Sequence, residues 1–173
     1  MITIKDFLNT PNGTIQLNWS SIEKNLGFQI HNGLKDFYSR LLCGEHSCIE
    51  GKYNLNESQF IKPPVEKFTQ WLELISGEIE YELLPLRTIE NCDKFIQSAF
   101  KKWMGDFDMG RRAMIGSFYT DVGDFLLLFN NDTGSIEWND SGYGHFEVYE
   151  DNPYGIFAKD IYEFYDKLST GMF

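Results

Sequence analysis

The sequence contains few of the residues that mark the specialised protein classes. Only three of its 173 residues are cysteine (Cys43, Cys48 and Cys92), and so small and odd a number excludes a disulfide scaffold. No stretch approaches the roughly 18 apolar residues of a membrane span. The N-terminus also lacks the basic and apolar regions of a signal peptide. We therefore expect a cytoplasmic protein with reduced thiols.

Basic residues are also scarce, because 15 Lys and Arg stand against 26 Asp and Glu, which gives a net charge of −11. Such a chain is not expected to bind nucleic acid, since phosphate contacts need Lys and Arg, and an anionic membrane would repel it. A basic protein partner would be attracted. The surplus is uneven: residues 105–163 hold 12 acids and three bases, a net of −9, whereas residues 1–104 have a net of −2.

Motifs for catalysis and for cofactor binding are missing as well. There is no nucleophile elbow and no glycine-rich phosphate loop. Cys43, His46 and Cys48 lack the second ligand pair of a zinc site, and Gly134 is out of place for a calcium loop that begins at Asn130. We expect no catalytic residue, no metal site and no cofactor. A hydrolase with an unrecognised carboxylate pair remains an open alternative.

The residues that are present predict a globular fold in one domain over residues 1–173. The hydrophobic content is 42% and the aromatic content is 16%, enough for a substantial core. Helical spacing of apolar residues predicts helices, with Ser20 and Glu23 as a capping box for the first and Thr88 as a cap for the fourth. The predicted helices cover residues 20–26, 32–42, 63–76, 88–104 and 156–168.

Alternation of apolar and polar residues predicts the strands. One is expected near Tyr53 and another across Ile79, Tyr81 and Leu83. Four more short runs follow, separated by turn residues, at 113–119, 124–130, 135–139 and 144–150. The fold class that follows is α+β: an antiparallel meander of about four strands plus one or two more, with helices packed on one face.

Three segments resemble the SUKH superfamily, which includes the Smi/Knr proteins and many bacterial toxin-immunity proteins. Residues 22–44, "IEKNLGFQIHNGLKDFYSRLLCG", are similar to its opening motif, although the proline that often precedes the second helix is absent. The matching residues are Ile22, Glu23, Leu26, Leu34, Phe37, Tyr38, Leu41 and Gly44. Residues 115–138 resemble the second motif through Gly116, Gly123 and Asp124, and residues 156–168 resemble its final helix. Residues 45–110 show no such likeness.

The resemblance implies an α+β fold and a binding role, commonly the neutralisation of a cognate toxin. A regulatory scaffold of the Smi/Knr or Syd kind is the alternative within that role. A nuclease toxin would need an electropositive active site, so an acidic immunity protein would complement it.

The acidic strand region is the predicted contact surface, because acids alternate there with the aromatic residues that often anchor interfaces. The candidate partner-binding residues are Asp121, Asp124, Asp132, Glu137, Trp138, Asp140, Tyr143, Glu147, Tyr149, Glu150 and Asp151. A solvated acidic sheet face without a partner is the plain alternative. In the run "SIEWND", Ile136 and Trp138 share a face opposite Glu137.

Overall fold

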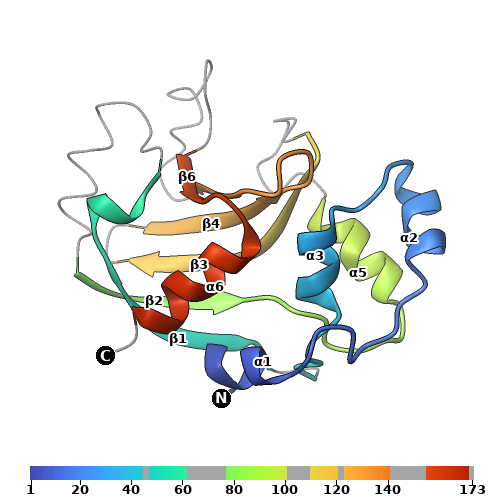
Figure 1. Ribbon diagram of the computed structural model, residues 1–173, viewed down its shortest axis with the longest axis horizontal. Coiled ribbons are helices and arrows are strands. Elements are labelled where there is room, and N and C mark those ends of the chain that lie inside the picture. Colours follow the sequence, from blue (N-terminus) through green and yellow to red (C-terminus); the bar gives the residue numbers. More distant parts are fainter. Residues whose placement is uncertain (45–46, 62–76, 101–109, 121–122, 141–154, 172–173) are drawn as a thin grey trace.

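The core of the fold is one six-stranded antiparallel sheet (Figure 1). The computed structural model describes residues 1–44, 47–61, 77–100, 110–120, 123–140 and 155–171. The strands are β1 (Ile49–Leu55), β2 (Gly77–Leu83), β3 (Arg112–Thr120), β4 (Gly123–Asn130), β5 (Ile136–Asp140) and β6 (Gly155–Ala158). Their order across the sheet is their order along the chain, so the sheet is a meander. This confirms the predicted α+β class.

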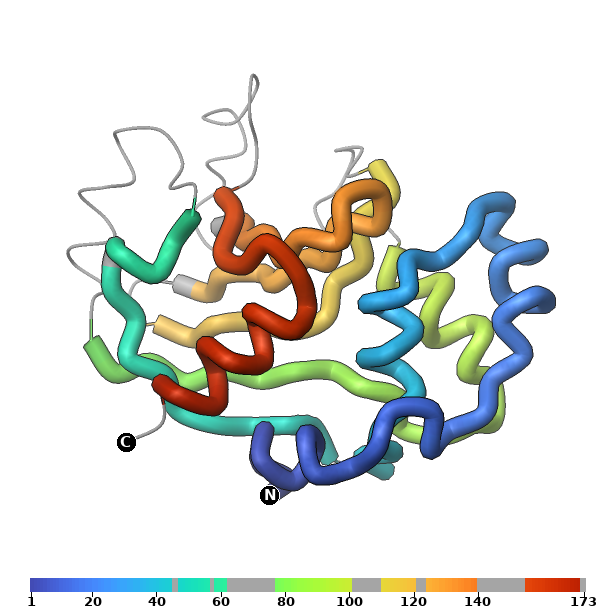
Figure 2. Tube along the Cα trace, in the orientation of Figure 1, coloured from blue at the N-terminus to red at the C-terminus, as the bar shows by residue number. Residues whose placement is uncertain are grey.

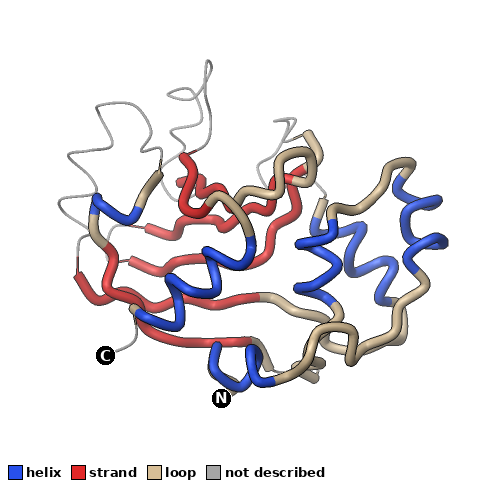
Figure 3. The backbone as a smooth tube through the Cα atoms, viewed as in Figure 1, coloured by secondary structure: helices blue, strands red, loops and turns tan. Residues whose placement is uncertain are grey.

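Five helices pack against this sheet in the described part of the chain (Figures 2 and 3). They are α1 (Ile4–Asn9), α2 (Trp19–Leu26), α3 (Asn32–Tyr38), α5 (Cys92–Ala99) and α6 (Ile161–Thr170), and a 3-10 turn covers Glu57–Gln59. Helix α6 crosses one face of the sheet, and α2, α3 and α5 gather at one end (Figure 1). None of these helices is long and apolar enough to cross a membrane.

Aromatic rings join the sheet to α6. Tyr53 of β1 stacks on Phe118 of β3 with ring centroids 6.0 Å apart, and both rings contact Phe157 of β6. Phe157 in turn contacts Phe164 of α6. Because side chains alternate along a strand, the face of the sheet that carries these rings is the core, and the opposite face is the outer face.

Strand β3 carries a bulge against β4 between Met114 and Gly116, and at Gly116 it also lies close to β2. A Cβ on Gly116 would lie 2.3 Å from the carbonyl oxygen of Glu82 on β2. No side chain fits there, so the glycine of the second SUKH-like motif has a structural role in this chain.

The predicted helix starts differ from those observed. Helix α2 begins at Trp19, with the Asn18 side chain accepting a hydrogen bond from the Ser21 amide, so the Ser20 capping box is wrong. Glu23 instead accepts from the Ile30 amide at 3.0 Å, a contact seven residues away. Helix α5 begins at Cys92 rather than after Thr88.

The helix ends and the last strand differ too. Helix α3 ends at Tyr38, four residues short of the prediction. Phe157 lies in β6 rather than in the closing helix, because Asp160 caps α6 by accepting hydrogen bonds from the Tyr162 and Glu163 amides. The predicted helix at 63–76 and the predicted strand at 144–150 both lie entirely outside the described residues.

Candidate functional site

The outer face of β1 and β2 carries a row of charged side chains. Antiparallel pairing sets Glu50 opposite Glu82, Lys52 opposite Glu80 and Asn54 opposite Glu78. The residues between them, such as Tyr53 and Tyr81, are buried in the core, so the charged set shares the outer face. Tyr119 of β3 lies opposite Glu80 and extends the row by one strand.

These side chains line a groove of about 550 Å³, which we call the acidic groove. It is lined by Met1, Thr3, Glu50, Gly51, Lys52, Glu78, Glu80, Tyr81, Glu82 and Tyr119. Four carboxylates therefore stand against one lysine, and the volume is in the range of known ligand sites.

Two polar contacts organise the groove and leave one of its carboxylates unpaired among the described residues. Lys52 forms an ion pair with Glu78, which raises the pKa of Lys52. The Tyr119 hydroxyl donates to Glu82 at 2.6 Å, and burial together with this bond raises the pKa of Tyr119. Glu80 has no hydrogen bond or ion pair with any described residue, so its carboxylate remains available to a ligand.

The Cys48 thiol lies beside the groove, in surroundings that favour its protonated form. The Cys48 sulfur donates to the Glu50 carboxylate at 3.0 Å. Burial raises the pKa of Cys48, and the neighbouring carboxylates Glu50 and Glu82 raise it further. Nucleophilic catalysis and metal binding both use the thiolate, so this environment disfavours either role for Cys48.

Metal binding has no geometric support where the structure describes the chain. No group of three or more His, Cys, Asp or Glu side chains is arranged to hold an ion there. His46 of the "CGEHSC" segment lies outside the described residues. The arrangement of the groove is instead suited to cationic side chains, because carboxylates form charge-assisted hydrogen bonds to Lys and Arg.

Two of the sequence-predicted binding residues are buried, which corrects the surface interpretation. Glu137 is paired with Arg112 and accepts a hydrogen bond from the Asn130 side chain at 2.6 Å. Trp138 is 1% exposed and its ring contacts Phe60 and Phe125. Both residues lie in strand β5, where neither is accessible to a partner in this conformation.

Other predicted binding residues lie at the surface or outside the described part. Asp124 is exposed, and Asp132 is exposed beside Arg111 at 3.3 Å. The hairpin turn itself is confirmed, since the Gly134 amide donates to the Asn130 carbonyl at 2.8 Å. The residues outside the description are Asp121, Tyr143, Glu147, Tyr149, Glu150 and Asp151, and the side chain of Asp140.

Net charge counted along the sequence did not predict the acidic groove, because its acids lie in residues 1–104, where the net charge is only −2. Its signal was nevertheless present in "GEIEYEL", where Glu78, Glu80 and Glu82 occupy every second position. That alternation places three carboxylates on one face of a strand. The pairing that adds Glu50 joins residues about 30 apart, so the local pattern does not contain it.

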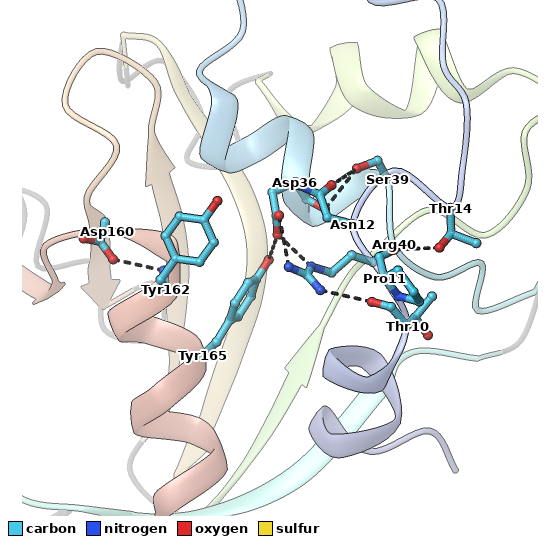
Figure 4. A network of polar contacts seen from close by, with 10 residues as sticks. All are labelled: Thr10, Pro11, Asn12, Thr14, Asp36, Ser39, Arg40, Asp160, Tyr162 and Tyr165. Atoms are coloured by element: carbon cyan, nitrogen blue, oxygen red, sulfur yellow. Dashed lines mark hydrogen bonds and ion pairs between the residues drawn. The ribbon is translucent and has the colours of Figure 1, made fainter.

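A second polar network, shown in Figure 4, is buried and joins elements rather than opening to a ligand. Arg40 donates to both carboxylate oxygens of Asp36, at 2.7 and 3.0 Å, and to the Thr10 carbonyl at 3.0 Å. The Tyr165 hydroxyl of α6 donates to the same carboxylate at 3.2 Å. Asp36 is 2% exposed. The network therefore ties α3, the segment after α1, and α6 together.

Comparison with known protein families and with curated proteins found no match to this chain.

Proposed function

We propose that the protein is a cytoplasmic binding protein that docks a basic protein partner at the acidic groove. The observation that carries this proposal is the row of Glu50, Glu78, Glu80 and Glu82 on an exposed sheet face. Among the described residues that line the groove, Lys52 is the one basic side chain beside them. Like charges so close together repel one another, and a basic partner relieves that repulsion on binding.

The resemblance to SUKH proteins supports a narrower proposal about the partner. On that reading the protein is an immunity protein, and its partner is the toxin domain that threatens the same cell. Neutralisation would be stoichiometric: the acidic face covers the toxin's electropositive working surface and changes no covalent bond. Complementary charge would speed association and make it sensitive to salt.

Charge reversal in the groove tests the proposal. The variant Glu50→Lys/Glu80→Lys changes two exposed side chains and leaves the buried face of the sheet untouched. The matched control is Glu90→Lys/Asp166→Lys, which makes the same change in net charge at exposed positions away from the groove. The genes beside this one should first be searched for a secreted protein with a C-terminal toxin domain. Cells should then express each variant together with that toxin domain, and growth should be measured.

The groove variant should lose protection while the control keeps it. Association of the purified proteins should slow at least tenfold for the groove variant, with a smaller change in dissociation, because peripheral charges act mainly on the association rate. Equal protection by both variants would remove the groove from the proposal. A partner that binds this protein and is not toxic would favour the regulatory scaffold.

A further inference from the structure

Among the described residues, the first strand of the sheet has an open edge beside the acidic groove. Within that part of the chain, strand β1 pairs along its length with β2 alone, and it is the first strand in the sheet order. Its other side meets the N-terminal segment at one point, where the Glu50 amide donates to the Ile2 carbonyl at 3.0 Å. Edge strands expose backbone groups that can pair with another chain.

The Glu50 contact shows which residues face that edge. Backbone N–H and C=O groups alternate in direction along an antiparallel strand, so residues two and four positions after Glu50 point the same way. These are Lys52 and Asn54, and both side chains are exposed. Within the described ranges no backbone hydrogen bond to Lys52 or Asn54 is found at that edge.

We propose that this edge binds an extended, basic segment of the partner as an added strand. The proposal rests on the proposed function and specifies how the partner is held. Hydrogen bonds to the backbone of Lys52 and Asn54 would supply pairing, and alternate Lys or Arg side chains of the segment would reach the groove carboxylates. An added strand would lie about 5 Å from β1 and about 10 Å from β2, within reach of a lysine side chain.

Charge selects a basic segment over a second copy of the same chain. The outer face of β1 itself carries one acid and one base, Glu50 and Lys52, and the surplus of carboxylates lies on β2. Two copies paired through β1 would place two faces of net negative charge side by side, and these faces would repel each other. A segment with Lys or Arg at every second position places its positive charges on the same face as Glu50 and Glu80.

Peptides separate strand addition from simple charge attraction. The probe is an acetylated hexapeptide of alternating Lys and Thr, measured by fluorescence anisotropy with the full protein. Two further peptides carry N-methyl groups on every second backbone nitrogen. One is methylated at the odd-numbered positions and the other at the even-numbered positions. Methylation removes the N–H donors along one edge of the peptide and keeps its charge. The peptide whose methyl groups lie on the edge that faces β1 should therefore bind at least tenfold more weakly than the unmethylated peptide.

A pair of protein variants tests the same edge from the other side. Asn54→Pro removes the outward N–H without touching the bonds to β2, which edge positions tolerate, and Asn54→Ala keeps that N–H. Asn54→Pro should weaken peptide binding at least tenfold and Asn54→Ala less than twofold. In hydrogen exchange, the Lys52 and Asn54 amides should gain protection when the parent peptide binds.

The outcomes distinguish the two proposals. Equal binding of all three peptides, lost in Glu50→Lys/Glu80→Lys, would overturn strand addition and leave the acidic groove as the docking site. Binding that is unaffected by those charge reversals, or no binding at low salt, would overturn both. A dimer in light scattering, with Lys52 and Asn54 already protected, would assign the edge to a second copy and overturn the inference.

Discussion

At the scale of single residues, two kinds of buried phenol occur in this core. The Tyr165 hydroxyl donates to Asp36, so burial leaves it satisfied. The hydroxyls of Tyr38 and Tyr81 are buried without a hydrogen-bond partner among the described residues. A buried polar group without a partner costs about 1–3 kcal/mol. The two kinds should therefore respond in opposite directions when the hydroxyl is removed.

Replacing Tyr81 by Phe should stabilise the protein by about 1 kcal/mol, because the ring stays in place and the unsatisfied hydroxyl is gone. Tyr165→Phe is the matched control and should cost about 1–2 kcal/mol, since it removes a donor to a buried carboxylate. Urea denaturation of both variants measures the difference. Equal destabilisation by both changes would mean that the Tyr81 hydroxyl does form a hydrogen bond in the folded protein.

At the scale of elements, the strands could be predicted from the sequence better than the helix limits. Alternation identifies β2, β3, β4 and β5, because one face of each strand carries a run of buried residues. Strand β6 was missed because it has only four residues and Phe157 fits the helical spacing that follows it. The candidate site needed the register between β1 and β2, and that pairing is not local.

The junction of α1, α3 and α6 depends on one ion pair more than on any capping residue. Arg40 is the guanidinium that compensates the buried Asp36 carboxylate, and it also lies over the rings of Phe7 and Tyr165. Helix α3 ends two residues before Arg40, so the side chain can turn back onto the helix. The junction thus joins segments about 130 residues apart in sequence.

The variant Arg40→Met should cost about 3–5 kcal/mol, because it leaves a buried carboxylate without its partner. The double variant Asp36→Leu/Arg40→Met removes both charges and should recover much of that loss. Thermal and urea unfolding measure the two variants. If Arg40→Met is as stable as the double variant, then the unpaired Asp36 carboxylate carries no cost, and the ion pair does not stabilise this junction.

At the scale of the whole molecule, charge follows the fold rather than the sequence. The groove acids come from residues 1–104, the half with a net charge of only −2. Lys35, in the same half, forms an ion pair with Glu23 between helices α3 and α2, so it does not neutralise the groove. In the other half, Glu137 is buried against Arg112. The expected acidic surface over residues 105–163 remains a prediction.

The whole molecule should lose stability in alkali, because burial raises the pKa of several tyrosines. Tyr53 and Tyr81, each 1% exposed, have pKa values of about 12. An unfolded phenol has a pKa of about 10. Between these values the unfolded chain loses protons that the folded chain keeps, so the unfolding free energy falls as pH rises. Below about pH 10 both states hold the protons, and the stabilisation is complete.

The loss should approach about 2–3 kcal/mol for each of these two phenols by about pH 12. Urea denaturation at several pH values above about 9, read beside the ultraviolet absorbance of phenolate, measures it. The double variant Tyr53→Phe/Tyr81→Phe should flatten the profile, whereas Tyr162→Phe, at an exposed position on α6, is the control. A profile that stays level in the native protein would mean that these phenols ionise in place, and the core would then admit water near β1 and β2.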